Sequence, residues 1–125
     1  MTDETPKPKR FYETAKAVQM PGGWTVELDG RSIKTPARAA LSLPTEKLAK
    51  AIAAEWNAQG EHIDLAAMHL TRLANVAIDR TPETRFEMAD ELARYCETDL
   101  VCHIAEDSEE LAELEEAHWA PLRAW

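Results

Sequence analysis

The sequence predicts an α+β fold, with a small antiparallel β portion at the N-terminus followed by packed α-helices. Residues 24–28 alternate apolar and polar side chains and lead directly into Asp29-Gly30, a dipeptide favoured in two-residue hairpin turns. From Leu43 onward, apolar residues instead recur every three or four positions, the spacing of amphipathic helices. We therefore expect a β-rich portion over residues 1–43 and a helical portion over residues 44–125.

The β-rich portion is predicted to contain several short strands joined by tight turns. Met1 to Lys9 is polar and rich in proline and is expected to be a loose tail. Pro21-Gly22-Gly23 is expected to be a turn, and the strands before and after it belong to one antiparallel sheet. We expect strands over residues 11–18, 24–28 and 32–36, and one more short strand at Leu41 and Leu43.

The first helix is predicted to begin after Thr45, a good N-cap residue that Glu46 follows at the positive end of the helix dipole. Gly60 stands where a left-handed C-terminal cap is expected, so this helix should end at about Gln59. Its apolar face combines three large residues at a spacing of four: Leu48, Ile52 and Trp56.

A second helix is predicted from the helical spacing of apolar residues up to Asp79. The connection before it contains Ile63, Leu65 and Met68, so we expect this segment to pack against the fold. Two amphipathic helices this close together should fold back on each other or share a sheet. The predicted apolar face of the second helix consists of Leu70, Leu73, Ala74, Ala77 and Ile78.

The remaining signals are also helical. Thr81-Pro82 is predicted to be an N-cap and first helical residue, and residues 98–103 either extend that helix or break it with a turn. Asp107 with Glu110 has the spacing of a capping box for a last helix, which Pro121 should end or kink. The predicted apolar faces are Phe86, Ala89, Leu92, Ala93 and Cys96 in the third helix, and Leu111, Leu114, His118 and Leu122 in the last.

The net charge of -9 is concentrated in the C-terminal part of the chain. Residues 1–42 hold seven Lys/Arg and five Asp/Glu (+2), residues 43–80 four and five (-1), and residues 81–125 three and thirteen (-10). A phosphate backbone requires a basic face, so the distribution argues against nucleic-acid binding. The acidic part either steers the chain toward a basic partner or keeps it soluble.

The lack of a recognisable targeting signal, together with two cysteines that are expected to be unpaired, indicates a reducing compartment. No apolar run approaches membrane-spanning length, and the first residues lack the features of a signal or transit peptide. Cys96 and Cys102 would lie on different faces of a continuous helix, so we expect reduced thiols. The predicted location is the bacterial cytoplasm, or alternatively the mitochondrial matrix after processing.

No catalytic, cofactor or metal site is predicted. Glu115 and His118 form a Glu-x-x-His pair, but di-metal helical bundles need two such pairs and further carboxylates. A small metal-binding enzyme that uses these two residues therefore remains a minor alternative. The sequence contains no phosphate-binding glycine motif and no nucleophile elbow, and no small-molecule substrate is expected.

Four tryptophans are many for a chain of this length. Tryptophan is usually buried, so a core role is the first expectation. A cluster of exposed apolar residues would instead indicate a binding surface for another protein. The sequence does not decide between these two interpretations for any of the four, which are Trp24, Trp56, Trp119 and Trp125.

Several segments together resemble one family. They are RFYETAKA, GGWTVELDGRSIKTP, LSLPTEKLAKAIAAEWNAQGEHID, HLTRLANVAIDR, YCETDLVCH and the closing HWAPLRAW. In this order and spacing, over residues 10–125, the chain resembles the assembly chaperones of the F-type ATP synthase that hold the alpha subunit. Five residues at positions that match the family stand out, and the sequence does not say which of them contact a client protein: Arg31, Trp56, Arg72, Asn75 and Asp79.

The resemblance implies a protein without enzymatic activity, cofactor or nucleotide requirement. Such a chaperone binds the unassembled alpha subunit and prevents its aggregation until the beta subunit replaces it. Family members are about twice this length, so we expect residues 44–125 to be the start of a larger helical domain that is cut off at Trp125. The competing interpretation is a generic helical protein–protein interaction module.

Overall fold

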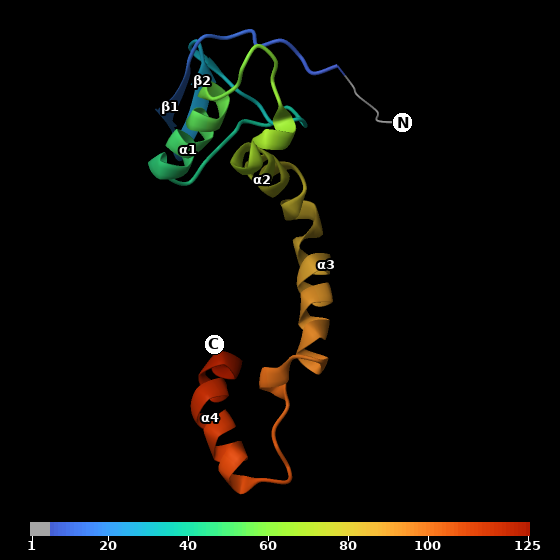
Figure 1. The fold of residues 1–125 in the computed structure, drawn as a ribbon. Coiled ribbons are helices and arrows are strands. Elements are labelled where there is room, and N and C mark those ends of the chain that lie inside the picture. The colour runs from blue at the N-terminus through green and yellow to red at the C-terminus, as the bar shows by residue number, and fades with distance from the viewer. Residues whose placement is uncertain (1–5) are drawn as a thin grey trace. The chain divides into compact units, whose positions relative to one another are not determined.

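The computed structural model describes residues 6–125 and confirms the predicted α+β class (Figure 1). Contacts divide the chain into two compact units, Met1–Glu83 and Thr84–Trp125, which we describe separately. The division expected at residues 43 and 44, which separates strands from helices, stays a prediction. The elements are β1 (Ala15–Met20), β2 (Gly23–Leu28), β3 (Arg31–Ser32), α1 (Glu46–Asn57), η1 (Leu65–Ala67), α2 (His69–Asp79), α3 (Thr81–Ala93), η2 (Arg94–Glu97), η3 (Leu100–Cys102) and α4 (Glu109–Ala124).

The sheet is an antiparallel meander with strand order β1-β2-β3. Met20 pairs with Gly23 across the first turn, where Gly22 has a φ of +84°. Leu28 pairs with Arg31 across the second turn, in which Asp29 and Gly30 have φ values of 49° and 81°. Both turn residues therefore have the positive φ that the Asp29-Gly30 dipeptide predicts.

Two predicted strands are shorter than expected, and one is absent as a strand. β1 begins at Ala15 instead of Phe11, because the Asp29 carboxylate accepts the N–H bonds of Glu13 and Thr14 at 2.9 Å each and holds them out of the ladder. The return strand ends at Ser32. The segment at Leu41 and Leu43 makes one isolated bridge to the sheet, in which Leu43 pairs with Trp24.

Helix α1 begins as predicted, since the Thr45 hydroxyl accepts the Leu48 N–H at 3.2 Å. It ends at Asn57 instead of Gln59, and its C-cap Ala58 is right-handed, so Gly60 is not a left-handed cap. Side chains from the N-terminal segment bind the last carbonyl groups instead. Arg10 donates to the Gln59 carbonyl at 2.6 Å, and Tyr12 donates to that of Trp56 at 2.7 Å.

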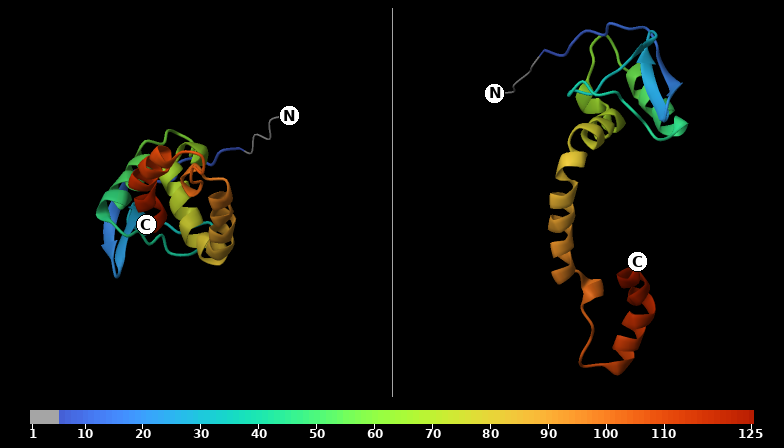
Figure 2. Two further views of the ribbon diagram at one scale, coloured as in Figure 1. Left: turned by 90° about the horizontal axis from the view of Figure 1, so that it is seen from below. Right: turned by 180° about the vertical axis from the view of Figure 1, so that it is seen from behind.

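The core of the first unit lies between the sheet and α1, which packs against β1 and β2 (Figure 2). Predicted face residue Ile52 is fully buried, while Leu48 and Trp56 are half-buried at its edge. The buried apolar residues are Tyr12, Ala15, Val26, Leu28, Leu41, Leu43, Ala49, Ile52, Ala53, Ile63, Met68 and Ala74.

Helix α2 buries only part of the predicted face. Ala74 is buried and Ile78 is half-buried against the core, together with the unpredicted Thr71, whereas Leu70, Leu73 and Ala77 are exposed. The orientation follows from the preceding helix, because the Glu55 carboxylate accepts the N–H groups of Leu70 and Thr71 at 2.7 and 2.9 Å. In the connection before α2, Ile63 and Met68 pack as predicted, but Leu65 is exposed.

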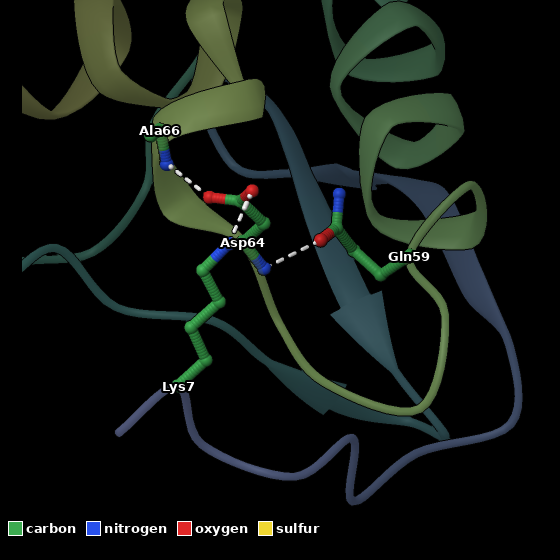
Figure 3. Close-up of polar contacts among 4 residues, drawn as sticks. All are labelled: Lys7, Gln59, Asp64 and Ala66. Carbon is green, nitrogen blue, oxygen red and sulfur yellow. Dashed lines mark hydrogen bonds and ion pairs between the residues drawn. The ribbon is translucent and has the colours of Figure 1, made fainter. Parts of the chain in front are cut away.

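The expected loose tail is partly ordered. Met1–Thr5 lie outside the described residues, but Lys7 forms an ion pair with Asp64 at 2.8 Å (Figure 3). Ile63 donates its N–H to the Pro8 carbonyl at 2.8 Å, and Lys9 forms an isolated bridge with His62. Asp64 is itself held by Gln59 and Ala66, as the same figure shows.

The second unit contains helices without a buried core. All residues after Ala74 are exposed or half-buried, so the stripes predicted in α3 and α4, among them Phe86, Leu92, Leu111 and Leu114, are not buried. Of the two alternatives predicted for residues 98–103, the break is found: a turn at Thr98 separates η2 from η3.

Three predicted helix boundaries in this region are wrong. Thr81 lies within α3, and its hydroxyl donates to the Val76 carbonyl at 3.2 Å instead of capping. Ser108, not Asp107, caps α4 by accepting the Leu111 N–H at 3.3 Å. Pro121 lies inside α4, which continues to Ala124, so it does not end the helix; the alternative of a kink stays a prediction.

Candidate functional site

A cleft of about 590 Å³ lies between the strands and α1 in the first unit. We call it the aromatic cleft, because three aromatic side chains contribute to its lining. Two of the five residues highlighted by the family resemblance, Arg31 and Trp56, belong to it. Its lining residues are Phe11, Tyr12, Leu28, Asp29, Arg31, Ser32, Ile33, Lys34 and Trp56.

The aromatic side chains of the cleft support one another through edge contacts. The ring of Tyr12 lies 5.6 Å from that of Trp56 and 5.4 Å from that of Phe11, both in edge-to-face geometry. Tyr12 is buried, whereas Phe11 leaves 74% of its surface exposed. Burial raises the pKa of Tyr12, while the nearby Arg10 opposes this shift. Tyr12 is thus a fixed support, and Phe11 a surface available for contact.

Arg10 fixes the position of this aromatic group. Its guanidinium lies 4.7 Å from the centre of the Tyr12 ring. It also donates to the carbonyl groups of Tyr12, Glu13 and Gln59 at 3.0, 2.6 and 2.6 Å. The planar fork of arginine therefore ties the N-terminal segment to the end of α1.

The charged side chains at the rim of the cleft differ in whether they are free to bind a ligand. The Asp29 carboxylate is occupied by the N–H groups of Thr14 and Glu13, which lower the pKa of Asp29 below its ordinary value. The side chains of Arg31 and Lys34 are exposed, and neither side chain makes a hydrogen bond or ion pair within residues 6–125. The cleft therefore presents two available positive charges.

Trp56 carries the one unsatisfied polar atom of this region. Over the part of the chain that the structure describes, its Nε1 is the only buried side-chain nitrogen or oxygen without a hydrogen-bond partner. Leaving such a donor unpaired costs about 1–3 kcal/mol. The half-buried ring is thus held at the cleft by packing, against the ring of Tyr12 and against the core, and not by a hydrogen bond of its Nε1.

The other three residues highlighted by the resemblance lie in α2, away from the cleft lining. The Asp79 carboxylate bonds neither to Arg72 nor to the backbone of its own helix. It accepts the Thr35 hydroxyl at 2.6 Å and the Ala37 N–H at 3.1 Å. Its role in this geometry is to anchor the loop after β3. Arg72 is exposed beside Leu73 and Val76, and Asn75 is half-buried.

The residues considered for a metal site are placed in the second unit. Glu115 accepts the Ala105 N–H at 2.8 Å and thereby supports the loop before α4, while His118 is exposed. Across residues 6–125, no three His, Cys, Asp or Glu side chains lie together in a way that could hold a metal ion.

Cys96 and Cys102 are free thiols, although the helix that was expected to separate them is broken. Desolvation and the nearby Cys96 raise the pKa of the Cys102 thiol. No helix within the described residues has the length and apolar content needed to cross a membrane.

The sequence did not reveal the cleft itself. Arg31 and Trp56 were highlighted, but Phe11 was assigned to a strand and Ile33 and Lys34 to a longer return strand. The one local signal was the positive φ turn at Asp29-Gly30, which places the residues on both sides of it next to each other. Aromatic residues together with arginine are typical of protein-binding surfaces, so this α+β protein has a cleft with the composition of a protein-binding site.

Comparison with known proteins gives the particular family. The family model described as "ATP12 chaperone protein" matches residues 9–125, and the chain belongs to this family. A curated relative, the mitochondrial protein atp12 of Schizosaccharomyces pombe, is 27% identical over 94% of this chain and 44% of its own length.

Solved structures agree with the fold. The crystal structure of Atp12 from Paracoccus denitrificans has 42% identity and a TM-score of 0.71, covering 94% of this chain and 51% of its own. The Atu1473 protein from Agrobacterium tumefaciens has 34% identity and a TM-score of 0.69, covering 94% and 44%. The chain thus spans about half the length of the relatives that it matches.

Proposed function

We propose that this chain acts in assembly of the F-type ATP synthase as a chaperone that binds the unassembled alpha subunit. In this proposal it prevents aggregation of the alpha subunit until the beta subunit replaces it, without ATP and without catalysis. The observation that carries the proposal is the match to the ATP12 chaperone family over residues 9–125. The proposed location is the bacterial cytoplasm, with the mitochondrial matrix as alternative.

The exposed apolar residues support a binding role. Phe11, Leu73 and Phe86 leave 74%, 66% and 70% of their surfaces exposed. Exposed apolar surface is a feature of protein interaction sites, and the net charge of -9 favours solubility of a complex.

The proposal is tested by light scattering of purified alpha subunit diluted from denaturant, with and without an equal molar amount of this chain. We expect reduced aggregation that does not depend on added ATP. Because the chain covers about half of its relatives, we expect weaker protection than from Paracoccus denitrificans Atp12, the positive control. Unchanged aggregation while the positive control protects would refute the proposal.

A pull-down distinguishes this function from a generic interaction module. The tagged chain is incubated with bacterial lysate, and the bound proteins are compared with those bound to an unrelated acidic protein. Selective enrichment of the alpha subunit is expected. Broad capture of many helical proteins, without enrichment of the alpha subunit, would favour the generic module.

A further inference from the structure

We propose that the aromatic cleft binds an extended client segment in which an apolar side chain stands next to an acidic one. The apolar side chain would lie against Phe11 and Trp56, and the carboxylate would meet Arg31 and Lys34. This inference rests on the proposed function only in taking the ligand to be a polypeptide client.

The dimensions and lining of the cleft suit such a ligand. Its volume of about 590 Å³ lies within the range of roughly 300–1,000 Å³ that is usual for binding sites. Five of its nine lining residues are aromatic or aliphatic, and the polar residues lie in the turn before β3, in β3 and, for Lys34, just after it. The cleft therefore offers an apolar floor with a polar side.

Charge complementarity argues for an acidic segment. The side chains of Arg31 and Lys34 have no hydrogen-bond or ion-pair partner within residues 6–125, and the nearby carboxylate of Asp29 already accepts bonds from Glu13 and Thr14. Residues 1–42 carry a charge of +2, whereas residues 43–80 and 81–125 carry -1 and -10, which together make -11. In the unit that carries the cleft, Met1–Glu83, eleven Lys/Arg balance eleven Asp/Glu, so an acidic segment is attracted locally by Arg31 and Lys34, whereas residues 84–125, at -9, repel it.

The edge of the sheet argues for an extended polypeptide. β3 is an edge strand, and Ile33 donates its N–H to the Val26 carbonyl at 3.0 Å. The adjacent pair of Glu27 and Ser32 is therefore the one without ladder bonds, so the backbone N–H and carbonyl of Ser32 face away from β2. Ser32 lines the cleft, and an extended chain could pair with these two groups.

The test uses fluorescence anisotropy with a fluorescein-labelled, C-terminally amidated peptide of sequence Gly-Asp-Phe-Glu-Leu-Gly. We expect saturable binding that weakens as salt is raised. Two control peptides separate the contributions: Asn and Gln replace the acidic residues in one, and Ala replaces Phe and Leu in the other. Both should bind about tenfold more weakly, or worse, if charge and apolar contact are both needed.

Variants of exposed residues locate the site. Arg31→Glu combined with Lys34→Glu should weaken binding by about tenfold or more, and Phe11→Ala should weaken it by roughly fivefold. Lys47→Glu, compared with Lys34→Glu alone, is the charge-matched control, because Lys47 is an exposed cation on α1 outside the cleft lining. It should change binding less than about twofold. Circular dichroism confirms that each variant is folded.

Several outcomes would overturn the inference. They are absence of saturable peptide binding, equal binding of all three peptides, and an equal effect of Lys47→Glu and the cleft variants. Self-association in sedimentation that the Arg31→Glu and Lys34→Glu changes abolish would assign the cleft to a second copy instead.

The same variants in the aggregation assay keep the two proposals separate. If the wild-type chain protects the alpha subunit and the cleft variants protect equally, the inference fails and the proposed function stands. If the wild-type chain binds the acidic peptide at the cleft but gives no protection, the proposed function fails and the cleft chemistry stands.

Discussion

At the scale of single residues, several charged side chains stabilise backbone groups of distant segments. Glu55 lies on α1 and binds the first turn of α2, while Asp79 at the end of α2 binds the loop at Thr35 and Ala37. The Glu55 carboxylate accepts from Leu70 N–H, Thr71 N–H and the Thr71 hydroxyl at 2.7 to 2.9 Å. A carboxylate is well suited to the N-terminus of a helix, where N–H groups lack partners.

These bonds predict a pH-dependent stability. Burial alone would raise the pKa of Glu55, but the bonds from Leu70 and Thr71 outweigh it and hold the pKa below its ordinary value of 4.5. The folded state therefore binds fewer protons than the unfolded state. The contribution of Glu55 is fully present above about pH 4.5 and is lost as the pH falls through the lower pKa of the folded state.

Glu55→Gln should lower the free energy of unfolding by about 1–2 kcal/mol at pH 7. Its stability should also fall less between pH 6 and 3 than that of the wild type, as thermal unfolding followed by circular dichroism would show. Glu61→Gln is the control, since Glu61 is exposed and its carboxylate makes no hydrogen bond within residues 6–125. Identical pH profiles for Glu55→Gln and the wild type would contradict this explanation.

At the scale of elements, the close approach of two segments fixes the path of the chain before α1. Leu43 bonds to Trp24 in both directions, at 2.9 and 2.7 Å, and the preceding residue in β2 is Gly23. A Cβ atom at Gly23 would lie 2.5 Å from the Leu43 carbonyl oxygen. Gly60, by contrast, has open space around it and no left-handed φ.

The two glycines therefore predict opposite effects of the same substitution. Gly23→Ala should lower the free energy of unfolding by about 2 kcal/mol, because backbone must shift to remove the clash. Gly60→Ala should be neutral or stabilising by about 0.5 kcal/mol, because it reduces the freedom of the unfolded chain. Urea unfolding of both variants measures the difference. A large loss from Gly60→Ala would instead support the left-handed cap that the sequence suggested.

At the scale of the whole molecule, the buried residues belong to one of the two units. Every buried residue among those described lies between Tyr12 and Ala74, and none lies in Thr84–Trp125. The helices of the second unit are held by their caps and by polar contacts such as Arg123 with the Val101 carbonyl at 2.9 Å and with Glu116 at 2.7 Å. Surface ion pairs add little to stability, about 0–1 kcal/mol each.

This distribution predicts unequal protection of backbone amides. In hydrogen exchange of the 125-residue chain, the amides of β2 and α1 should be the slowest and report global unfolding. Amides of α4 should exchange at least about tenfold faster, through local opening. Equal protection of α4 and β2 would show that the second unit is stabilised by contacts that this structure lacks.

Local chemistry explains which parts of the structure could be predicted. The turn at Asp29-Gly30, the cap at Thr45 and the strand at residues 24–28 each depend on neighbouring residues, and all three are confirmed. The apolar face of α2 could be predicted only in part, since Ala74 and Ile78 pack on the core as expected. Leu70 and Leu73 have the right spacing, but Glu55 sets the rotation of the helix from 15 residues away.

The fold class, the turn at Asp29-Gly30, the cap at Thr45 and the family could all be inferred from the amino-acid order, because they depend on short-range patterns and on the identity of residues in sequence. The end of α1, the short β3 and the aromatic cleft became visible in the folded chain alone. Those features depend on contacts such as Arg10 with Gln59 and Tyr12 with Trp56, whose partners are 49 and 44 positions apart. Periodicity in a sequence does not encode which distant groups satisfy one another's hydrogen bonds.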